Sequence, residues 1–208
     1  MKKDREFKNL SKEYFNSIAE NYDNSHDGKF VNCMYKELVE RAITLKNKPH
    51  TILDLGCGNG NVIAMIAQKT DADLYGIDLS EKMIKEAKKR LDKAKLCVGD
   101  AEKLPYDDNK FDVVICNASF HHYPKPEIVL QEVKRVLKKD GTFILGDPTS
   151  PVNWYLKFLN WALKFSNSGD FHIYGKKEII KMLEKTGFTV TNWKKIDFKT
   201  FVLNAKLQ

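Results

Sequence analysis

Three glycines, with one residue between each pair, follow a short apolar run in the stretch TILDLGCGNGN, residues 51 to 61. Glycine allows positive φ angles and lets a ligand approach the main chain closely. At the start of a helix, such a turn also points backbone N–H groups at a polar ligand. Gly56, Gly58 and Gly60 therefore predict a binding site for a polar ligand of adenosine size.

The spacing of these glycines and the position of the next acid narrow the range of possible ligands. The dinucleotide fingerprint G-x-G-x-x-G would need a third glycine at position 61, which is Asn61, so an NAD-dependent oxidoreductase is disfavoured. Asp78 ends the apolar run LYGID, and an acid there can accept hydrogen bonds from the hydroxyls of a ribose. The alternative is that Asp78 caps the next helix, although Ser80 already supplies an N-cap side chain.

A parallel sheet would bring these residues to one edge. Apolar, strand-like runs alternate with segments of helical periodicity, which predicts a parallel sheet with helices on both faces. The strands are expected at 51–55, 73–78, 95–98, 111–116 and 142–146, and the helices at about 60–69, 80–91 and 126–138. The run FDVVIC is apolar apart from Asp112 and does not alternate, as in a strand that is buried on both faces.

The flanking segments add helices before this core and a hairpin after it. Two helices are expected at about 10–20 and 30–46, and the charged first ten residues are expected to fray. GKKEIIKMLEKTGF predicts an amphipathic helix that ends at Gly187. The runs 188–196 and 200–206 then predict an antiparallel hairpin at the sheet edge.

Five motifs in order, ILDLGCGNG, LYGIDLS, GDAEKLPY, FDVVICNASFHHYP and LKKDGTFIL, resemble class I S-adenosylmethionine-dependent methyltransferases, and most closely the small-molecule subgroup that includes quinone-biosynthesis enzymes. The resemblance implies an α/β fold: a Rossmann-like, doubly wound sheet of seven strands, mostly parallel with the last strand antiparallel. One domain, 1–208, is expected. Its parts are an N-terminal helical cap (1–48), a cofactor-binding core (49–147), a lid insertion (148–174) and a C-terminal helix and hairpin (175–208).

The resemblance also assigns cofactor contacts for S-adenosyl-L-methionine. The methionine part would lie against the glycine turn, with Asp54 toward the ammonium and the Asn117 backbone carbonyl as a further acceptor. Asp78 would bind the ribose, and Asp100 would accept a hydrogen bond from the adenine amino group. The full set of expected cofactor-binding residues is Asp54, Gly56, Cys57, Gly58, Gly60, Asp78, Leu79, Asp100, Ala101, Asn117 and Tyr22.

Methyl transfer from a sulfonium is an in-line displacement, so alignment of the acceptor can supply most of the acceleration. A base is needed only when the acceptor must lose a proton. His121 and His122, after the fourth strand, are the candidate bases, because histidine titrates near neutral pH; a role as a positioning wall is the alternative. Asp147 and His172 are weaker candidates. No metal ligand set is expected, because no carboxylates cluster at the matching strand ends.

A helix rich in aromatic residues is expected within 152–166. Trp154, Phe158, Trp161 and Phe165 recur at helical spacing and share one face. That face has three interpretations: a lid over an apolar acceptor, core packing or a dimer contact, and a membrane-surface helix. The segment YFNSIAENYDN resembles one that folds across the cofactor in this subgroup, so Tyr14 and Tyr22 are expected to close the site, or simply to pack.

Composition limits the possible partners and the cellular location of the protein. The net charge of +7 permits a nucleic-acid partner, but the lysines alternate with acids on expected helices, which is typical of solvated faces. The four cysteines form no CxxC pair and are expected to be reduced and buried. No apolar run is long enough for a membrane span, so a cytoplasmic monomer or homodimer is expected. The sequence thus predicts O- or C-methylation of a small apolar or aromatic acceptor; the rivals are an RNA or protein methyltransferase and a non-catalytic cofactor-binding protein.

Overall fold

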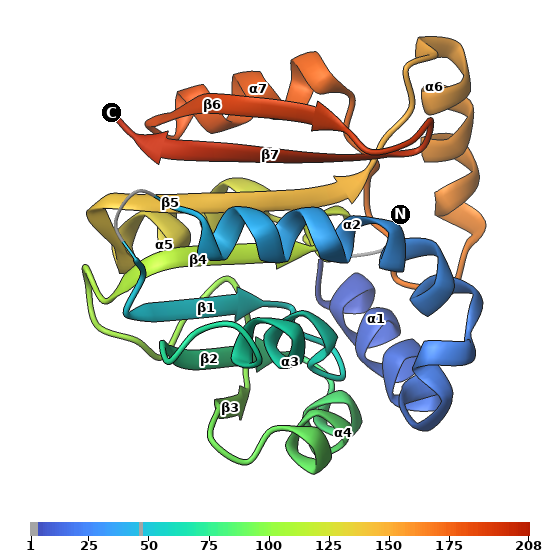
Figure 1. Ribbon diagram of the computed structural model, residues 1–208. Coiled ribbons are helices and arrows are strands. Elements are labelled where there is room, and N and C mark those ends of the chain that lie inside the picture. The colour runs from blue at the N-terminus through green and yellow to red at the C-terminus, as the bar shows by residue number, and fades with distance from the viewer. Residues whose placement is uncertain (1–3, 46–47) are drawn as a thin grey trace.

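A single sheet of seven strands organises the protein, and the computed structural model describes residues 4–45 and 48–208 (Figure 1). The strand order is β3-β2-β1-β4-β5-β7-β6, and β7 is antiparallel to both of its neighbours. The strands are β1 (Thr51–Leu55), β2 (Asp73–Asp78), β3 (Lys95–Val98), β4 (Phe111–Asn117), β5 (Leu137–Pro148), β6 (Phe188–Lys195) and β7 (Thr200–Leu207). Both the predicted sheet and the predicted C-terminal hairpin are confirmed.

Helices cover both faces of the sheet, as the alternation predicts. One face packs against α2 (His26–Ile43), α3 (Asn61–Ala67) and α4 (Glu81–Arg90). The other packs against α5 (Pro126–Val136) and α7 (Lys176–Lys185). Each helix contributes an apolar stripe to a dry core; in α5, for example, Val129 and Val133 are fully buried. The two hydrophobic layers hold the central strands rigidly and so fix the positions of their ends.

The strand ends matter because β1, β2 and β4 are parallel and their carboxyl ends meet at one edge of the sheet. The helix α1 (Asp4–Ile18) and the 3₁₀ turn η1 (Ala19–Asn24) cross this edge (Figure 1). The prediction that the first ten residues fray is wrong for residues 4–10, which belong to α1, while residues 1–3 lie outside the described residues. Lys8 explains the difference: its ammonium lies 2.7 Å from Asp100 and 2.8 Å from Glu102, which attaches α1 to the loop after β3.

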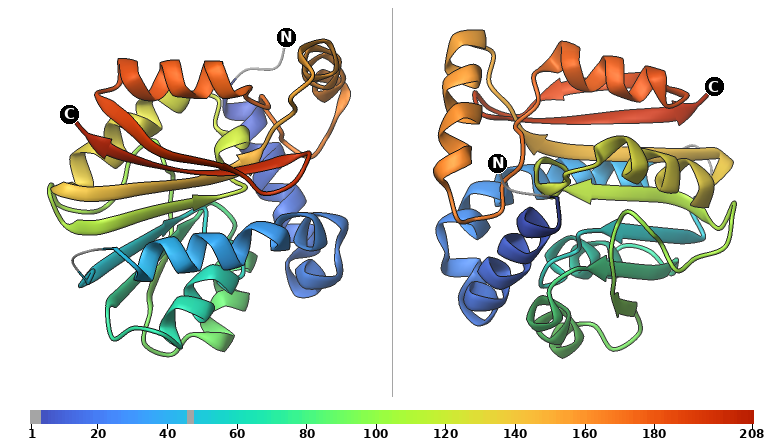
Figure 2. Two further views of the ribbon diagram at one scale, coloured as in Figure 1. Left: turned by 45° about the horizontal axis from the view of Figure 1, so that its top comes forward. Right: turned by 180° about the vertical axis from the view of Figure 1, so that it is seen from behind.

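A further helix, α6 (Asn153–Ala162), and the short turn η3 (Leu163–Phe165) connect β5 to α7 and lie at the same end of the molecule (Figure 2). Among the residues that the structure describes, no helix is both long and apolar enough to cross a membrane. One prediction about the cysteines is wrong: Cys33 is exposed and Cys97 is half-buried, whereas Cys57 and Cys116 are buried as expected.

Candidate active site

Two neighbouring cavities open at the carboxyl ends of the strands. The first, here called the glycine cleft, is lined by Lys8, Ser11, Phe15, Tyr22, Leu55, Gly56, Gly58, Ile77, Asp78, Leu79, Met83, Gly99, Asp100, Ala101, Asn117, Ala118, Ser119, His122 and Tyr123. The second, the histidine cavity, has a volume of about 330 Å³ and is lined by Tyr14, Phe15, Tyr22, His26, Asp27, Phe30, Val31, Ala118, His121, His122, Pro148, Leu163, Ser168, Asp170 and Ile173. Four residues line both cavities and form their common wall: Phe15, Tyr22, Ala118 and His122.

The glycine turn between β1 and α3 has the geometry that its sequence predicts. Gly56, Gly58 and Gly60 have φ angles of 70°, 52° and 83°. A Cβ on Gly56 would lie 2.0 Å from the Ser119 hydroxyl, and one on Gly60 would lie 2.7 Å from the Leu91 side chain. A Cβ on Gly58 would meet no atom within 4 Å, so this residue alone faces open space. Gly60 lines none of these cavities and serves packing instead.

A small recess beside the turn contains buried oxygens that lack partners. It is lined by Asp54, Cys57 and Asn117, among other residues, and shares Tyr22, Gly56 and Gly58 with the glycine cleft. Asp54 is 2% exposed, and among the described residues neither its Oδ1 nor the Asn117 Oδ1 has a hydrogen-bond partner. Burial, and then the charge of Asp78, raises the pKa of Asp54 to about 7. Such a recess suits a cationic group with hydrogen-bond donors.

Asp78 lies at the end of β2, as predicted. Its two carboxylate oxygens accept hydrogen bonds from the Gly58 and Ser80 amides, each at 2.8 Å. Ser80 caps α4 by accepting from the Met83 amide, so the helix does not need Asp78 as its only cap. Since each carboxylate oxygen has a second lone pair, Asp78 can still accept from a ligand in the cleft.

Asp100 is already paired before any ligand is considered. Its Oδ2 accepts from Lys8, and its Oδ1 accepts from the Glu102 amide at 2.9 Å. Leu79 and Ala101 line the same part of the cleft. The contact between Lys8 and Asp100 was not expected from the sequence, because no local pattern shows that a lysine in the first helix will contact an acid beyond the third strand.

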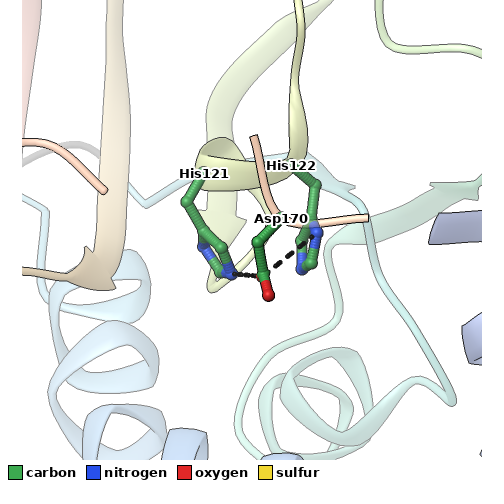
Figure 3. A group of neighbouring side chains, drawn as sticks. All are labelled: His121, His122 and Asp170. Atoms are coloured by element: carbon green, nitrogen blue, oxygen red, sulfur yellow. Dashed lines mark ion pairs between the residues drawn. The ribbon is translucent and has the colours of Figure 1, made fainter. Parts of the chain in front are cut away.

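His121 and His122 lie in the short turn η2 (Phe120–His122) that follows β4. Their side chains point toward Asp170, which lies in the segment after α6 (Figure 3). The His121 Nδ1 lies 2.9 Å from the Asp147 carboxylate, and its Nε2 lies 3.2 Å from Asp170 Oδ1. The His122 Nδ1 lies 3.5 Å from the same Asp170 oxygen. Asp147, a weaker candidate base from the sequence, is thus a buried partner of His121.

The two histidines carry different charges. Burial alone would lower the pKa of His121, but Asp147 and Asp170 outweigh it and raise that pKa to about 10. For His122, burial and then the charge of His121 lower the pKa to about 4. At neutral pH, His121 is therefore a cation held between two carboxylates, and His122 is a neutral imidazole in the common wall. The sequence could not distinguish the two.

Tyr14 and Tyr22 both line the histidine cavity, and Tyr14 donates a hydrogen bond to Asp27 at 2.7 Å. Ala118 has a positive φ of 48° although it is not glycine. This uncommon conformation places the common wall directly after β4, and such conformations cluster at functional sites.

The aromatic face of α6 and η3 does not line either cavity, so its four residues, Trp154, Phe158, Trp161 and Phe165, do not form the inner surface of a lid. Trp154 and Phe165 are each 72% exposed, and Phe158 and Trp161 are more than half exposed. The inner side of this segment instead uses Leu163, which lines the histidine cavity, and Asn160, which exchanges hydrogen bonds with the Ile173 backbone. The sequence showed that the aromatics share a face but not which way the face points.

Comparison with known proteins identifies relatives for this arrangement. Residues 46–189 match the model of the family described as methyltransferase domain. The demethylmenaquinone methyltransferase of Thermotoga maritima is 30% identical over 202 residues, which cover 85% of this chain and 87% of that protein.

Solved structures share the fold at lower identity. A chain of the complex between the Haloferax volcanii Trm112 methyltransferase activator and the putative methyltransferase superposes with a TM-score of 0.81 at 20% identity, covering 95% of this chain and 97% of that one. The Burkholderia thailandensis 1,6-didemethyltoxoflavin-N1-methyltransferase, with bound 1,6-didemethyltoxoflavin and S-adenosylhomocysteine, gives a TM-score of 0.78 at 15% identity, covering 100% of this chain and 92% of that one.

Proposed function

The chain belongs to the methyltransferase domain family, and from this premise we propose that it transfers a methyl group from S-adenosyl-L-methionine to a small, apolar or aromatic acceptor, at oxygen or carbon. One observation carries the proposal: the mostly apolar histidine cavity shares a wall with the glycine cleft. A cofactor in the cleft and an acceptor in the cavity would therefore meet at Phe15, Tyr22, Ala118 and His122.

The unpartnered oxygens beside the glycine turn support the choice of cofactor. Asp54 and Asn117 would hold the ammonium of the methionine part, which offers the donors that their buried oxygens lack. Gly58 leaves open space for the cofactor, while Gly56 and Cys57 anchor the turn by donating to the Ile77 carbonyl at 2.8 and 3.0 Å.

The nucleoside part of the cofactor would lie farther along the cleft. Asp78 would accept from the ribose hydroxyls. Leu79 and Ala101 would contact the adenine, and Asp100 would accept from its amino group while keeping its bond to Lys8. Tyr22 would close the cleft from η1. Gly60 would act indirectly, by packing α3 against α4.

When bound, S-adenosylmethionine supplies a methyl group on a sulfonium, so that alignment of the acceptor provides much of the acceleration. A hydroxyl acceptor must also lose its proton. His121 already holds a proton between Asp147 and Asp170, so it is a poor acceptor of another. His122 is the neutral member of the pair and lies in the common wall, so we assign proton acceptance to His122 rather than to His121.

The acceptor class follows from the cavity. Its lining is aliphatic and aromatic over most of its surface, with polar groups gathered near the histidines and Asp27. A planar aromatic hydroxyl compound would bury its ring and direct its polar edge to His122. The Thermotoga maritima relative is named for demethylmenaquinone, a quinone that likewise has a planar, largely apolar ring system.

The test combines binding and turnover. Calorimetry should show binding of S-adenosylmethionine and its demethylated product but not of NADH, and Asp78→Ala should weaken the binding by about 1.5–3 kcal/mol. Transfer of labelled methyl groups to a panel of naphthols, quinols and phenols then tests the acceptor class. Labelling of RNA or protein, with none of the panel labelled, would overturn the small-molecule assignment. Unchanged affinity in Asp78→Ala would overturn the ribose contact.

A further inference from the structure

His121, His122 and Asp170 bring three metal-ligating side chains together in the wall of the histidine cavity (Figure 3). We infer that they form a binding site for one divalent transition-metal ion of the Zn²⁺ type. The sequence predicted no such site, because Asp170 is distant from the histidine pair along the chain and joins it only in the folded protein.

Two of the three distances between ligand atoms fit tetrahedral coordination. The His121 Nε2 and the His122 Nδ1 lie 3.2 and 3.5 Å from the same oxygen, Asp170 Oδ1, and the three atoms all lie within 4.8 Å of one another. Bonds to Zn²⁺ of about 2.0–2.2 Å at tetrahedral angles separate the ligand atoms by about 3.3–3.5 Å. Two of the three ligand separations are therefore already close to those of a zinc site.

The His122 Nδ1 gives an independent reason to expect an occupant. This nitrogen is buried in a side chain that is only 10% exposed, and it has no hydrogen-bond partner within the part of the chain that the structure describes. It faces Asp170 at a distance too long for a strong hydrogen bond. A cation between the two would satisfy both the nitrogen and the carboxylate.

The surrounding contacts orient the ligands as in known metal centres. Asp147, which is 1% exposed, binds the His121 Nδ1 and so directs the Nε2 toward Asp170. In the free protein His121 is a cation, so an ion at the Nε2 displaces the proton of that nitrogen to solvent, while the Nδ1 keeps its proton and its bond to Asp147. The other oxygen of Asp170 accepts a hydrogen bond from the Ser168 hydroxyl, which leaves Oδ1 for an ion. A carboxylate behind a ligating histidine is the usual outer partner of a metal-bound imidazole.

Three protein ligands leave a fourth position, which is the arrangement of catalytic rather than structural zinc sites. All three ligands line the histidine cavity, so the open position would face the acceptor. If the proposed function holds, the ion would bind the acceptor oxygen and lower the pKa of its hydroxyl, and His122 would then act as a ligand instead of a base. Only this use rests on the proposed function; the binding site rests on the geometry.

The experiment is calorimetric titration of the full chain with Zn²⁺, without cofactor or acceptor, in a Cys33→Ser background that removes the exposed thiol. We expect one ion per chain. Asp170→Asn and His122→Asn should each weaken binding more than about 100-fold, because loss of an outer partner alone costs about 10- to 100-fold. Asp147→Asn removes such an outer partner, so it should weaken Zn²⁺ binding by about 10- to 100-fold. His50→Asn, an exposed histidine beside β1, is the matched control and should bind normally.

Cobalt gives a second readout, because a tetrahedral Co²⁺ site has strong visible d–d bands that a loosely bound ion lacks. Folding of each variant is checked by circular dichroism; if Asp170→Asn does not fold, His122→Asn, which keeps both carboxylates around His121, decides the question. The absence of stoichiometric binding to the folded wild-type chain would overturn the inference. So would binding that both ligand variants leave unchanged. Neither outcome bears on methyl transfer, which the labelling assay measures separately.

Discussion

Lys8 in α1 donates a hydrogen bond to Asp100, in the loop after β3, at 2.7 Å, and this pair joins the beginning of the chain to the edge of the glycine cleft. The Lys8 side chain is 21% exposed and also contacts Glu102 at 2.8 Å. Asp100 is also one of the proposed adenine contacts, so the same carboxylate attaches α1 to the cleft and would bind the cofactor.

Lys8→Met should therefore loosen α1. We expect faster hydrogen exchange across residues 4–18, because the side chain that attaches this helix to the cleft is lost, while the amides of β4 and β5 stay protected. Lys12→Met is the matched control, since Lys12 pairs with the half-exposed Glu81 and should change the exchange little. Equal exchange of α1 in Lys8→Met and the wild type would show that the pair does not hold the helix.

Asp54 should make cofactor affinity depend on pH. Its pKa is raised to about 7, so below pH 7 the free protein holds a proton there that a cationic ligand must displace. Affinity should rise from pH 6 to pH 8, by up to about tenfold per unit below pH 7. Asp54→Asn should bind more weakly and with a flatter pH profile. A profile that keeps the wild-type slope in Asp54→Asn would assign the titration to another group.

Two alanine substitutions should separate ligand binding from packing in the glycine turn. Gly58→Ala places a Cβ in open space at a φ of 52°, so it should cost about 1–2 kcal/mol of stability yet weaken cofactor binding at least tenfold. Gly60→Ala meets Leu91 at 2.7 Å and should destabilise the fold more than Gly58→Ala does. Chemical denaturation and calorimetry measure both effects; equal cofactor loss in both variants would contradict the separation.

The outer face of α6 should contribute little to folding. Trp154→Ser and Phe165→Ser change side chains that are each 72% exposed, so each should alter the free energy of unfolding by no more than about 0.5 kcal/mol. Leu156→Ala, on the inner side at 8% exposure, should cost about 2 kcal/mol or more. Urea denaturation compares the three variants. A large loss in Trp154→Ser would mean that the aromatic face is covered in solution.

Local patterns in the sequence were enough to predict the central sheet. The apolar residues of the run FDVVIC are buried in β4, and Ser80 caps α4 as its position suggested. The turn glycines have the positive φ angles that their spacing implied. These features depend on neighbouring residues, because strand burial, capping and turn geometry are fixed within a few positions along the chain. The family then follows, since its motifs are strings of such local features.

Contacts between distant segments needed the tertiary structure. Lys8 contacts Asp100, and Asp170 contacts His121 and His122, although these residues are far apart along the chain. Only folding brings them together. The charge of each histidine depends on burial and on carboxylates from β5 and the α6 segment, which no local pattern encodes. The direction of the α6 aromatic face is set by how Asn160 and Leu163 attach the helix. The sequence by itself determined the scaffold and the cofactor class. Packing between remote elements decided which side chains line the wall of the proposed acceptor cavity and what charge they carry, because electrostatics and orientation depend on three-dimensional distance.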